Sequence, residues 1–269
     1  MACETALKLS SDRKRVLDGE EAVAMIEVWY WQMHDFLTSK HRYCLAEWFD
    51  RGERDRACSF RFELDRDRYV MAHILCRLAL GNRLGLRPEA LTFRRVAGRK
   101  PCLTNDSGVD FSISTTPRLA AVAVADGAII GLDIECRQHV EMMQEVSTLI
   151  LSDQERQDVE ALNEPDRATR LLRLWTLKEA YLKAKGTGLA IPPNLVSFAF
   201  ATETITCRDG TDDRHDFTFQ TGTCLQAHFA IASRGLPASS ARSFEFERGC
   251  FRKLNITTSA APDERLPLV

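Results

Sequence analysis

Two acidic residues stand at alternate positions in the apolar segment Ile129–Glu135. Because side chains alternate between the two faces of a strand, Asp133 and Glu135 share one face, and Leu132 and Ile134 share the other. Neighbouring carboxylates repel each other unless a cation lies between them. Hard oxygen ligands in this arrangement suit Mg²⁺ or Mn²⁺ rather than zinc. The segment therefore predicts a site for a divalent cation.

A second pair of charged residues follows further along the chain. Glu179 and Lys183 are four residues apart in a helical pattern, so both lie on one face of the helix. Taken alone, such a pair is typical of a surface ion pair. Beside the acidic strand, however, Glu179 would supply a third carboxylate to the cation, and Lys183 would stand one turn away, ready to meet an anion.

The elements that position these residues can be read from hydrophobic periodicity. An amphipathic helix is expected over Asp166–Lys185, where Gly186 and Gly188 permit the positive φ that ends a helix. A second amphipathic helix is expected over Asp65–Leu80, ended by Gly81 and Gly85. The acidic strand is expected to form a hairpin with Leu119–Ala125, turning at Asp126-Gly127.

The remaining segments alternate between strands and short helices. Helices are expected from Thr38 to about Phe49, over Glu141–Leu151, and after a capping box at Ser152–Glu155. Strands are expected over Ala22–Trp31, Leu91–Val96, Phe111–Thr116, Leu195–Cys207, His215–Thr221, Leu225–Ala232 and Phe244–Glu247. Each half of the chain thus contains a strand, a short helix, a long helix with a glycine stop, and further strands, which is a weak internal repeat.

This pattern predicts an α+β fold. We expect a flexible N-terminus over 1–20, an N-terminal α+β half over 21–125, a C-terminal half with the metal site over 126–235, and a C-terminal extension over 236–269.

Composition excludes several classes of protein. The chain has 269 residues and a net charge of −2, so its bulk charge favours neither nucleic acid nor an anionic membrane as partner. It shows no apolar run of membrane-spanning length and no signal peptide. Its nine cysteines include no C-x-x-C pair, which indicates reduced thiols rather than disulfides or zinc. We therefore expect a cytoplasmic protein.

The motifs, taken together, resemble a known family. Gly131-Leu-Asp133-Ile-Glu135, followed by Trp175-x-x-Lys178-Glu179-Ala-x-x-Lys183-x-x-Gly186-x-Gly188-Leu189, is similar to 4′-phosphopantetheinyl transferases of the long, surfactin-synthetase-activating type. The Lys100-Pro101 turn and the Phe111-Ser-Ile-Ser114 strand stand where that family has its Gly-Lys-Pro and Phe-Asn-x-Ser-His-Ser segments. The likeness covers about residues 45–235, and its motifs keep their order.

The resemblance implies a monomer built as a pseudo-dimer of two similar halves. Each half would be a small antiparallel sheet packed on a long helix, with coenzyme A in the cleft between them. The implied reaction is the Mg²⁺-dependent transfer of the 4′-phosphopantetheine arm of coenzyme A to a serine of an apo acyl or peptidyl carrier protein, releasing adenosine 3′,5′-bisphosphate. Asp133, Glu135 and Glu179 fall on the metal positions of the family. Lys183 falls on its catalytic lysine, and Glu179 is our first choice for the base.

The resemblance also implies a set of coenzyme-binding residues: Arg56, Arg68, Lys100, Pro101, Ser114, Thr115 and Thr116. Two positions depart from the family. Thr115 replaces a histidine that grips the coenzyme's phosphate, and a hydroxyl carries no charge. Glu53 replaces one of two basic residues before the long helix. The first departure implies either weaker binding of coenzyme A or compensation by a neighbouring arginine.

The sequence also suits two other interpretations. The two departures also suit a non-catalytic module of the same fold that binds coenzyme A or a carrier protein. The arginine-rich segment 51–68 suggests a nucleic-acid-binding protein, although the acidic residues interleaved in this segment argue against that function. Ser112 and Ser114 are also suited to satisfying backbone groups, Trp175 is expected in the core, and His73 is assigned no role.

Overall fold

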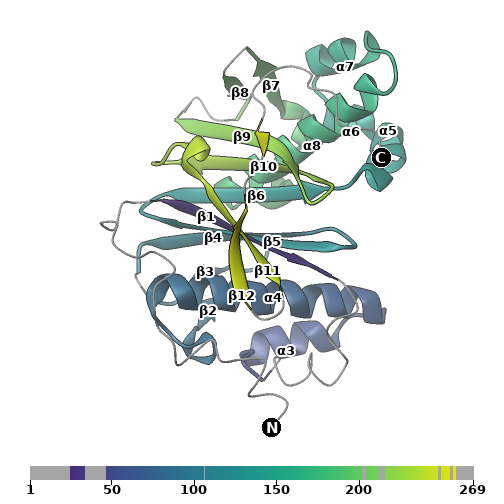
Figure 1. The fold of residues 1–269 in the computed structure, drawn as a ribbon. Coiled ribbons are helices and arrows are strands. Elements are labelled where there is room, and N and C mark those ends of the chain that lie inside the picture. The colour runs from purple at the N-terminus through teal and green to yellow at the C-terminus, as the bar shows by residue number, and fades with distance from the viewer. Residues whose placement is uncertain are drawn as a thin grey trace.

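The computed structural model describes residues 25–33, 47–105, 107–201, 204–211, 216–247, 250–254 and 257–258. It shows a mixed α+β fold in four layers, in which two sheets lie face to face and one long helix covers each outer face (Figure 1). The helix α4 (Glu63–Leu84) covers one sheet, and α8 (Asp166–Lys185) covers the other. The expected segment 1–20 and most of the expected helix after Thr38 lie outside the described residues.

The sheet under α4 has five strands in the order β12-β11-β1-β5-β4. Its strands are β1 (Ile26–Gln32), β4 (Val109–Thr115), β5 (Leu119–Asp126), β11 (Arg242–Glu247) and β12 (Cys250–Leu254). Strand β11 runs parallel to β1, while the other pairs are antiparallel. The strand expected at Phe244–Glu247 is thus present, and it returns the C-terminal part of the chain to the N-terminal sheet.

The sheet under α8 has four strands in the order β13-β9-β10-β6. They are β6 (Ile129–Glu135), β9 (Phe217–Cys224), β10 (Ala227–Arg234) and β13 (Thr257–Thr258). Two small antiparallel pairs complete the strands: β2 (Phe93–Arg94) with β3 (Cys102–Leu103), and β7 (Val196–Phe200) with β8 (Ile205–Asp209). The expected strands Leu91–Val96 and Leu195–Cys207 are therefore too long, and the latter is a hairpin.

Short helices connect these layers. They are α3 (Arg51–Cys58), α5 (Val140–Glu145), α6 (Ser147–Ile150) and α7 (Asp153–Glu160), with 3-10 turns at Pro88–Ala90, Arg137–His139, Gly188–Ala190, Pro193–Leu195 and Ala238–Ser240. The single helix expected over Glu141–Leu151 is therefore broken at Val146. No helix in the described part of the chain combines the length and the apolar character needed to cross a bilayer.

Burial follows the alternation expected for β6. Its Ile130, Leu132 and Ile134 side chains pack in the core between the two sheets, against strands β1, β5 and β10. Asp133, on the opposite face, is turned toward the α8 side of the sheet, where its carboxylate meets Lys183. The prediction that Asp133 does not share the face of Leu132 and Ile134 is thus confirmed.

One expectation about β6 is wrong. Strands β5 and β6 are not a hairpin, because β5 pairs with β1 and β4 whereas β6 pairs with β10 in the other sheet. Gly127, at φ +64°, lets the chain pass from one sheet to the next. As a result, β6 is an edge strand that faces β4 across the junction of the two sheets.

Side chains of β4 accept hydrogen bonds from the backbone N–H groups along the free edge of β6. The backbone N–H groups of Ile130, Leu132 and Ile134 donate to side-chain oxygens of Asp110, Ser112 and Ser114, at 2.9, 2.9 and 3.2 Å respectively. Unpaired backbone donors at a buried edge are costly, so this side-chain ladder takes the place of a partner strand. The backbone-satisfying role considered for Ser112 and Ser114 is confirmed, and the two sheets are fixed beside each other at the position of Asp133.

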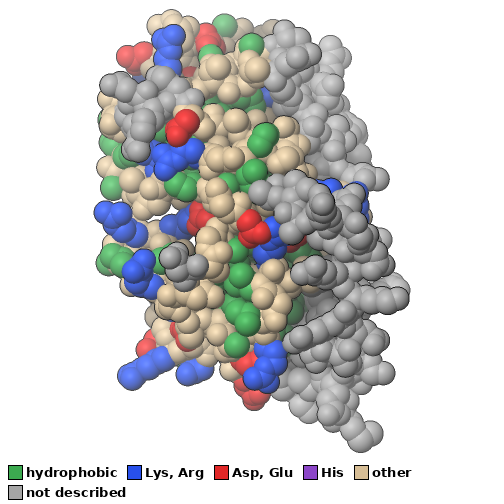
Figure 2. Space-filling view, turned by 90° about the vertical axis from the view of Figure 1, so that its left-hand side faces the viewer, with side chains coloured by type: hydrophobic (Ala, Val, Ile, Leu, Met, Phe, Trp, Pro, Cys, Tyr) green, Lys and Arg blue, Asp and Glu red, His purple; other side chains and the backbone are tan. Residues whose placement is uncertain are grey.

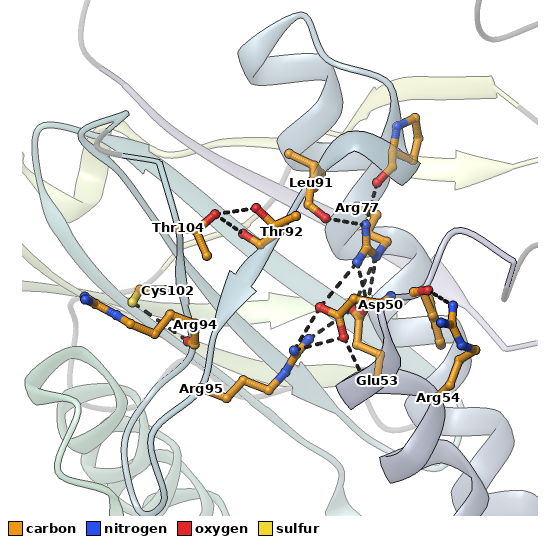
Figure 3. Close-up of polar contacts among 12 residues, drawn as sticks. Asp50, Glu53, Arg54, Arg77, Leu91, Thr92, Arg94, Arg95, Cys102 and Thr104 are labelled. Carbon is orange, nitrogen blue, oxygen red and sulfur yellow. Dashed lines mark hydrogen bonds and ion pairs between the residues drawn. The ribbon is translucent and has the colours of Figure 1, made fainter.

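Each long helix also carries one buried cation that ties it to a capped short helix. Arg77 of α4 donates from Nη2 to Glu53 at 2.5 Å, and Glu53 forms the capping box of α3 with Asp50 (Figure 3). Lys178 of α8 donates to Glu155 at 2.5 Å, and Glu155 forms the capping box of α7, as its sequence predicts. In each half the cation also donates to carbonyl oxygens that follow its helix, Pro88 and Leu91 for Arg77, and Pro193 and Val196 for Lys178.

Candidate active site

Two pockets adjoin where the edge strands β4 and β6 meet the long helices. The smaller, about 420 Å³, is lined by Phe60, Asp65, Arg68, Tyr69, Ala72, His73, Ile113, Ser114, Thr115, Asp133, Glu135 and Lys183. The larger, about 670 Å³, is lined by His73, Gly98, Arg99, Lys100, Pro101, Phe111, Ser112, Ile113, Lys183, Gly186, Thr187, Gly188 and Ala190. Because His73, Ile113 and Lys183 line both, the two pockets are neighbouring parts of one depression. A further hollow of about 500 Å³, beside Gly108 and Arg234, contains none of the predicted site residues.

Asp133 is held by two donors on one oxygen only. Its Oδ1 accepts from Lys183 Nζ at 2.6 Å and from Ser114 Oγ at 2.8 Å, and Lys183 Nζ also donates to Ser114 Oγ at 3.1 Å. Its Oδ2 is buried without a hydrogen-bond partner. Burial raises the pKa of Asp133, and the Lys183 ammonium opposes that effect. An unsatisfied buried carboxylate oxygen is unfavourable, so Oδ2 is suited to a further ligand such as a cation.

Glu135 has both oxygens engaged. Trp175 Nε1 donates to its Oε1 at 2.9 Å, and His139 Nδ1 lies 2.7 Å from its Oε2. Trp175 was expected in the core and lies half-buried, with its indole N–H directed at this carboxylate. The two contacts fix the orientation of Glu135 at the end of β6.

Glu179 is half-buried on α8, within electrostatic reach of both strand carboxylates. Burial, with the Asp133 and Glu135 charges adding to it and Lys183 opposing it, raises the pKa of Glu179 to about 7. A carboxyl group with that pKa is partly ionised at neutral pH and can accept a proton from a substrate hydroxyl.

The three acidic side chains have the oxygen donors that a divalent cation prefers, but they are not arranged as a preformed set of metal ligands. Within the described residues, no three His, Cys, Asp or Glu side chains are arranged as a ready set of metal ligands. The oxygen donors, their mutual repulsion and the unpartnered Oδ2 of Asp133 suit Mg²⁺. Each Glu135 oxygen already meets one side-chain nitrogen, of Trp175 or of His139, and keeps a second lone pair with which it could coordinate an ion.

Five of the seven residues expected to bind the coenzyme line the pockets. Arg68, Ser114 and Thr115 line the smaller pocket, and Lys100 and Pro101 line the larger. Thr116 and Arg56 do not. Thr116 is buried in the β4–β5 turn, where its Oγ1 accepts from the Arg118 and Leu119 amides. Arg56 is exposed on α3 and lies over the Phe60 ring, 4.8 Å from its centroid.

The ammonium group of Lys100 forms hydrogen bonds within the protein and is not directed into the pocket. Its Nζ donates to Asp110 Oδ2 at 2.6 Å and to the Ile130 carbonyl at 2.7 Å. It therefore joins the turn after β2 to both β4 and β6, and its ammonium is already neutralised by Asp110. The ammonium group of Lys100 therefore has little remaining charge or hydrogen-bonding capacity for a ligand.

The replacement of a basic residue by Glu53 has a structural reason. Glu53 is buried, caps α3 and pairs with Arg77, and Asp50 pairs with Arg95 at 2.9 Å (Figure 3). The side chain is thus directed into the protein and away from both pockets. Among the described residues on the face that Figure 2 shows, basic side chains are scattered among acidic and apolar ones and form no continuous basic stripe of the kind typical of a nucleic-acid interface.

Sequence reasoning missed three residues of the site. His73 and Tyr69 lie on α4 at the pocket wall, with their rings stacked at 3.8 Å, and His139 holds Glu135. The helical spacing of Tyr69 and His73 was a usable signal, since both lie on the face of α4 that Arg68 adjoins. Nothing in the sequence predicts that His139 turns back to Glu135, because that contact depends on the 3-10 turn after β6.

Comparisons with known proteins find similar chains over the part of the sequence that contains these residues. Residues 129–233 match the model of the 4′-phosphopantetheinyl transferase superfamily, and this range contains Asp133, Glu135, Glu179 and Lys183. The chain is 31% identical to 4′-phosphopantetheinyl transferase HetI of Nostoc sp. over 54% of the chain and 63% of the relative. It is 26% identical to 4′-phosphopantetheinyl transferase Sfp of Bacillus subtilis over 52% of the chain and 61% of the relative.

Another relative aligns over more of the chain. A phosphopantetheinyl transferase of Thraustochytrium sp. is 26% identical over 73% of the chain and 74% of the relative. The matched part of the chain spans less than two thirds of the length of the Nostoc and Bacillus relatives. Residues 129–233, which bring the acidic strand and the lysine of α8 together, are thus the part of the chain that is similar to the 4′-phosphopantetheinyl transferase superfamily.

Proposed function

We propose that the protein transfers the 4′-phosphopantetheine arm of coenzyme A to a serine of an apo acyl or peptidyl carrier protein. The observation that carries the proposal is the environment of Asp133, which has one oxygen held by Lys183 and Ser114 and the other unsatisfied, beside two adjoining pockets. The curated relatives are named as transferases of this kind, which supports the proposal.

We further propose that the molecule is a pseudo-dimer whose halves meet at the site. Two features support this proposal: the capped short helix tied to a buried cation of the long helix occurs in each half, and each long helix ends at a left-handed glycine, Gly85 or Gly186. The halves would span 21–125 and 126–235. Coenzyme A would lie between them, and a single chain would contain the whole site.

In the proposed reaction the carrier serine attacks the phosphorus that bears the pantetheine arm. The serine O–P bond forms, the bond to the bridging diphosphate oxygen breaks, and adenosine 3′,5′-bisphosphate leaves. Glu179 takes the serine proton, for which its raised pKa suits it. Lys183 exchanges its contact with Asp133 for the leaving phosphate oxygen and stabilises the charge that develops there.

A bound Mg²⁺ would neutralise the charge of the diphosphate. We propose Asp133, Glu135 and Glu179 as its ligands, with Mn²⁺ as a substitute. Ser114 keeps Asp133 Oδ1 oriented, and thereby leaves Oδ2 directed away from that hydrogen bond. Trp175 and His139 fix the orientation of the Glu135 carboxylate, from which it would coordinate the cation.

Intact-mass spectrometry of a panel of apo carrier proteins tests this function. Each carrier is incubated with the protein, coenzyme A and Mg²⁺, alongside a matched carrier whose acceptor serine is replaced by alanine. We expect a mass gain of one phosphopantetheine arm on at least one carrier and none on its serine-to-alanine control. Coenzyme A binding without a mass gain on any acyl or peptidyl carrier would instead support a non-catalytic binding module.

A further inference from the structure

Strand β4 directs two buried serine side chains at the edge of β6. Ser112 accepts from the Leu132 backbone N–H at 2.9 Å, and Ser114 accepts from the Ile134 backbone N–H at 3.2 Å. Because the two serines are two residues apart on one strand, they lie on the same face of it. They therefore make the same kind of contact with β6, and they differ in the group that receives the hydroxyl proton.

The hydroxyl of Ser112 donates to the backbone. Its Oγ lies 3.4 Å from the Leu132 carbonyl oxygen, so both of its contacts are with one residue of β6. Ser114 instead donates to Asp133 Oδ1 at 2.8 Å. Of the two matched hydroxyl groups, one thus completes the edge of the strand, and the other holds an acidic side chain of the site.

The Ser114 hydroxyl has no hydrogen-bonding capacity left for a ligand. A hydroxyl group offers one donor and two acceptor lone pairs. The donor is used by Asp133, and the lone pairs accept from the Ile134 amide and from Lys183 Nζ, the latter at 3.1 Å. Ser114 lines the smaller pocket, but its hydroxyl would have to give up Asp133 to donate to a phosphate oxygen.

Lys183 is held by the same hydroxyl. Its ammonium has three N–H donors, of which one meets Asp133 Oδ1 at 2.6 Å and one meets Ser114 Oγ. No other acceptor for Lys183 is present among the described residues, so the third donor is available to a ligand in the pockets that Lys183 lines. Lys183, Ser114 and Asp133 thus form a triangle in which each pair is joined by a hydrogen bond.

We propose that Ser114 is a positioning residue, whose hydroxyl orients Asp133 for the cation and does not bind coenzyme A. The proposal rests on the proposed function, in which Lys183 exchanges Asp133 for the leaving phosphate oxygen. Once Lys183 has moved, the Ser114 hydroxyl is the donor that still holds Asp133 Oδ1 among the described residues. The terminal torsion of an aspartate has a broad energy minimum, so this bond fixes which oxygen faces the cation.

Mn²⁺ binding to Ser114→Ala tests this role, with Ser112→Ala as the matched control. Each variant removes one side-chain acceptor from the edge of β6, but Ser114→Ala also removes the donor to Asp133. Electron paramagnetic resonance measures the Mn²⁺ affinity without coenzyme A. We expect about tenfold weaker binding by Ser114→Ala, as is typical when a residue that orients a metal ligand is lost, and a change of less than about threefold for Ser112→Ala.

A conservative variant separates the hydroxyl group from packing. Ser114→Thr keeps the hydroxyl, and its Mn²⁺ affinity should stay within about threefold of wild type. A loss equal to that of Ser114→Ala would assign the effect to packing and overturn the proposal. Unchanged Mn²⁺ affinity of Ser114→Ala, or an equal loss in Ser112→Ala, would also overturn it.

Coenzyme A affinity, measured by calorimetry without a metal ion, tests the second half of the proposal. It should change by less than about threefold in Ser114→Ala, because the hydroxyl is fully used within the protein. A tenfold loss of coenzyme affinity would make Ser114 a coenzyme contact and overturn the assignment while leaving the proposed function intact. A wild-type protein that binds neither Mn²⁺ nor coenzyme A would contradict the proposed function itself.

Discussion

Replacing Lys183 by alanine is expected to lower the rate of phosphopantetheine transfer by about two orders of magnitude or more. The substitution removes the only cation that contacts Asp133 among the described residues, and with it the group that we assign to the leaving phosphate oxygen. Single-turnover transfer to a carrier protein, measured at saturating coenzyme A, separates this loss of rate from a loss of binding.

Lys185→Ala is the matched control for this variant. Lys185 lies two residues further along α8, where its ammonium pairs with Asp209 at 2.7 Å. It is thus a lysine of the same helix that lines neither pocket, and the transfer rate of its alanine variant should stay within about threefold of wild type. Wild-type turnover by a folded Lys183→Ala protein would remove the proposed role of this lysine.

Replacing Gly131 by alanine is expected to destabilise the fold by more than about 3 kcal/mol. A Cβ atom at this position would overlap the Ala180 carbonyl oxygen and lie 2.6 Å from the Ala184 amide nitrogen and 2.9 Å from the Ala184 Cβ. These are backbone atoms and a buried methyl group of α8, so the helix must move away from β6. That movement would also separate Glu179 and Lys183 from Asp133. Urea unfolding followed by circular dichroism measures the loss.

Gly210→Ala provides the comparison. A Cβ atom there would meet the Leu195 carbonyl at 3.5 Å, which is an ordinary van der Waals contact. We expect this variant to unfold within about 1 kcal/mol of wild type. A Gly131→Ala protein as stable as Gly210→Ala would show that the close approach of α8 to β6 is not required.

Local patterns in the sequence were sufficient to predict the elements that carry the site. Helix α8 has the expected bounds, because its apolar spacing and its glycine stop both depend on neighbouring residues. The capping box at Ser152 and Glu155 is also confirmed for the same reason. Helix α4 begins two residues earlier than expected and continues through Gly81 to Leu84, since a single glycine within a packed helix costs only about 1 kcal/mol.

Contacts between distant parts of the chain were not predictable in the same way. The two strands on either side of Gly127 are adjacent in sequence and alternate well, yet they belong to different sheets. A hairpin signal describes the turn and not the pairing partner. Likewise, only the packing of the two sheets shows that Asp110 accepts hydrogen bonds from both Lys100 and the Ile130 amide. The engagement of Glu135 by Trp175 and His139 also follows from tertiary packing.

The proposed reaction depends on one divalent ion shared by the acids of β6 and α8. Electron paramagnetic resonance of Mn²⁺ measures this directly, since free Mn²⁺ gives a sharp signal that binding broadens. We predict one Mn²⁺ per wild-type chain, at least about tenfold weaker binding by Asp133→Ala, and unchanged binding by a control, Asp153→Ala, whose carboxylate is exposed on α7. Equal Mn²⁺ affinity of Asp133→Ala and wild type would contradict the account.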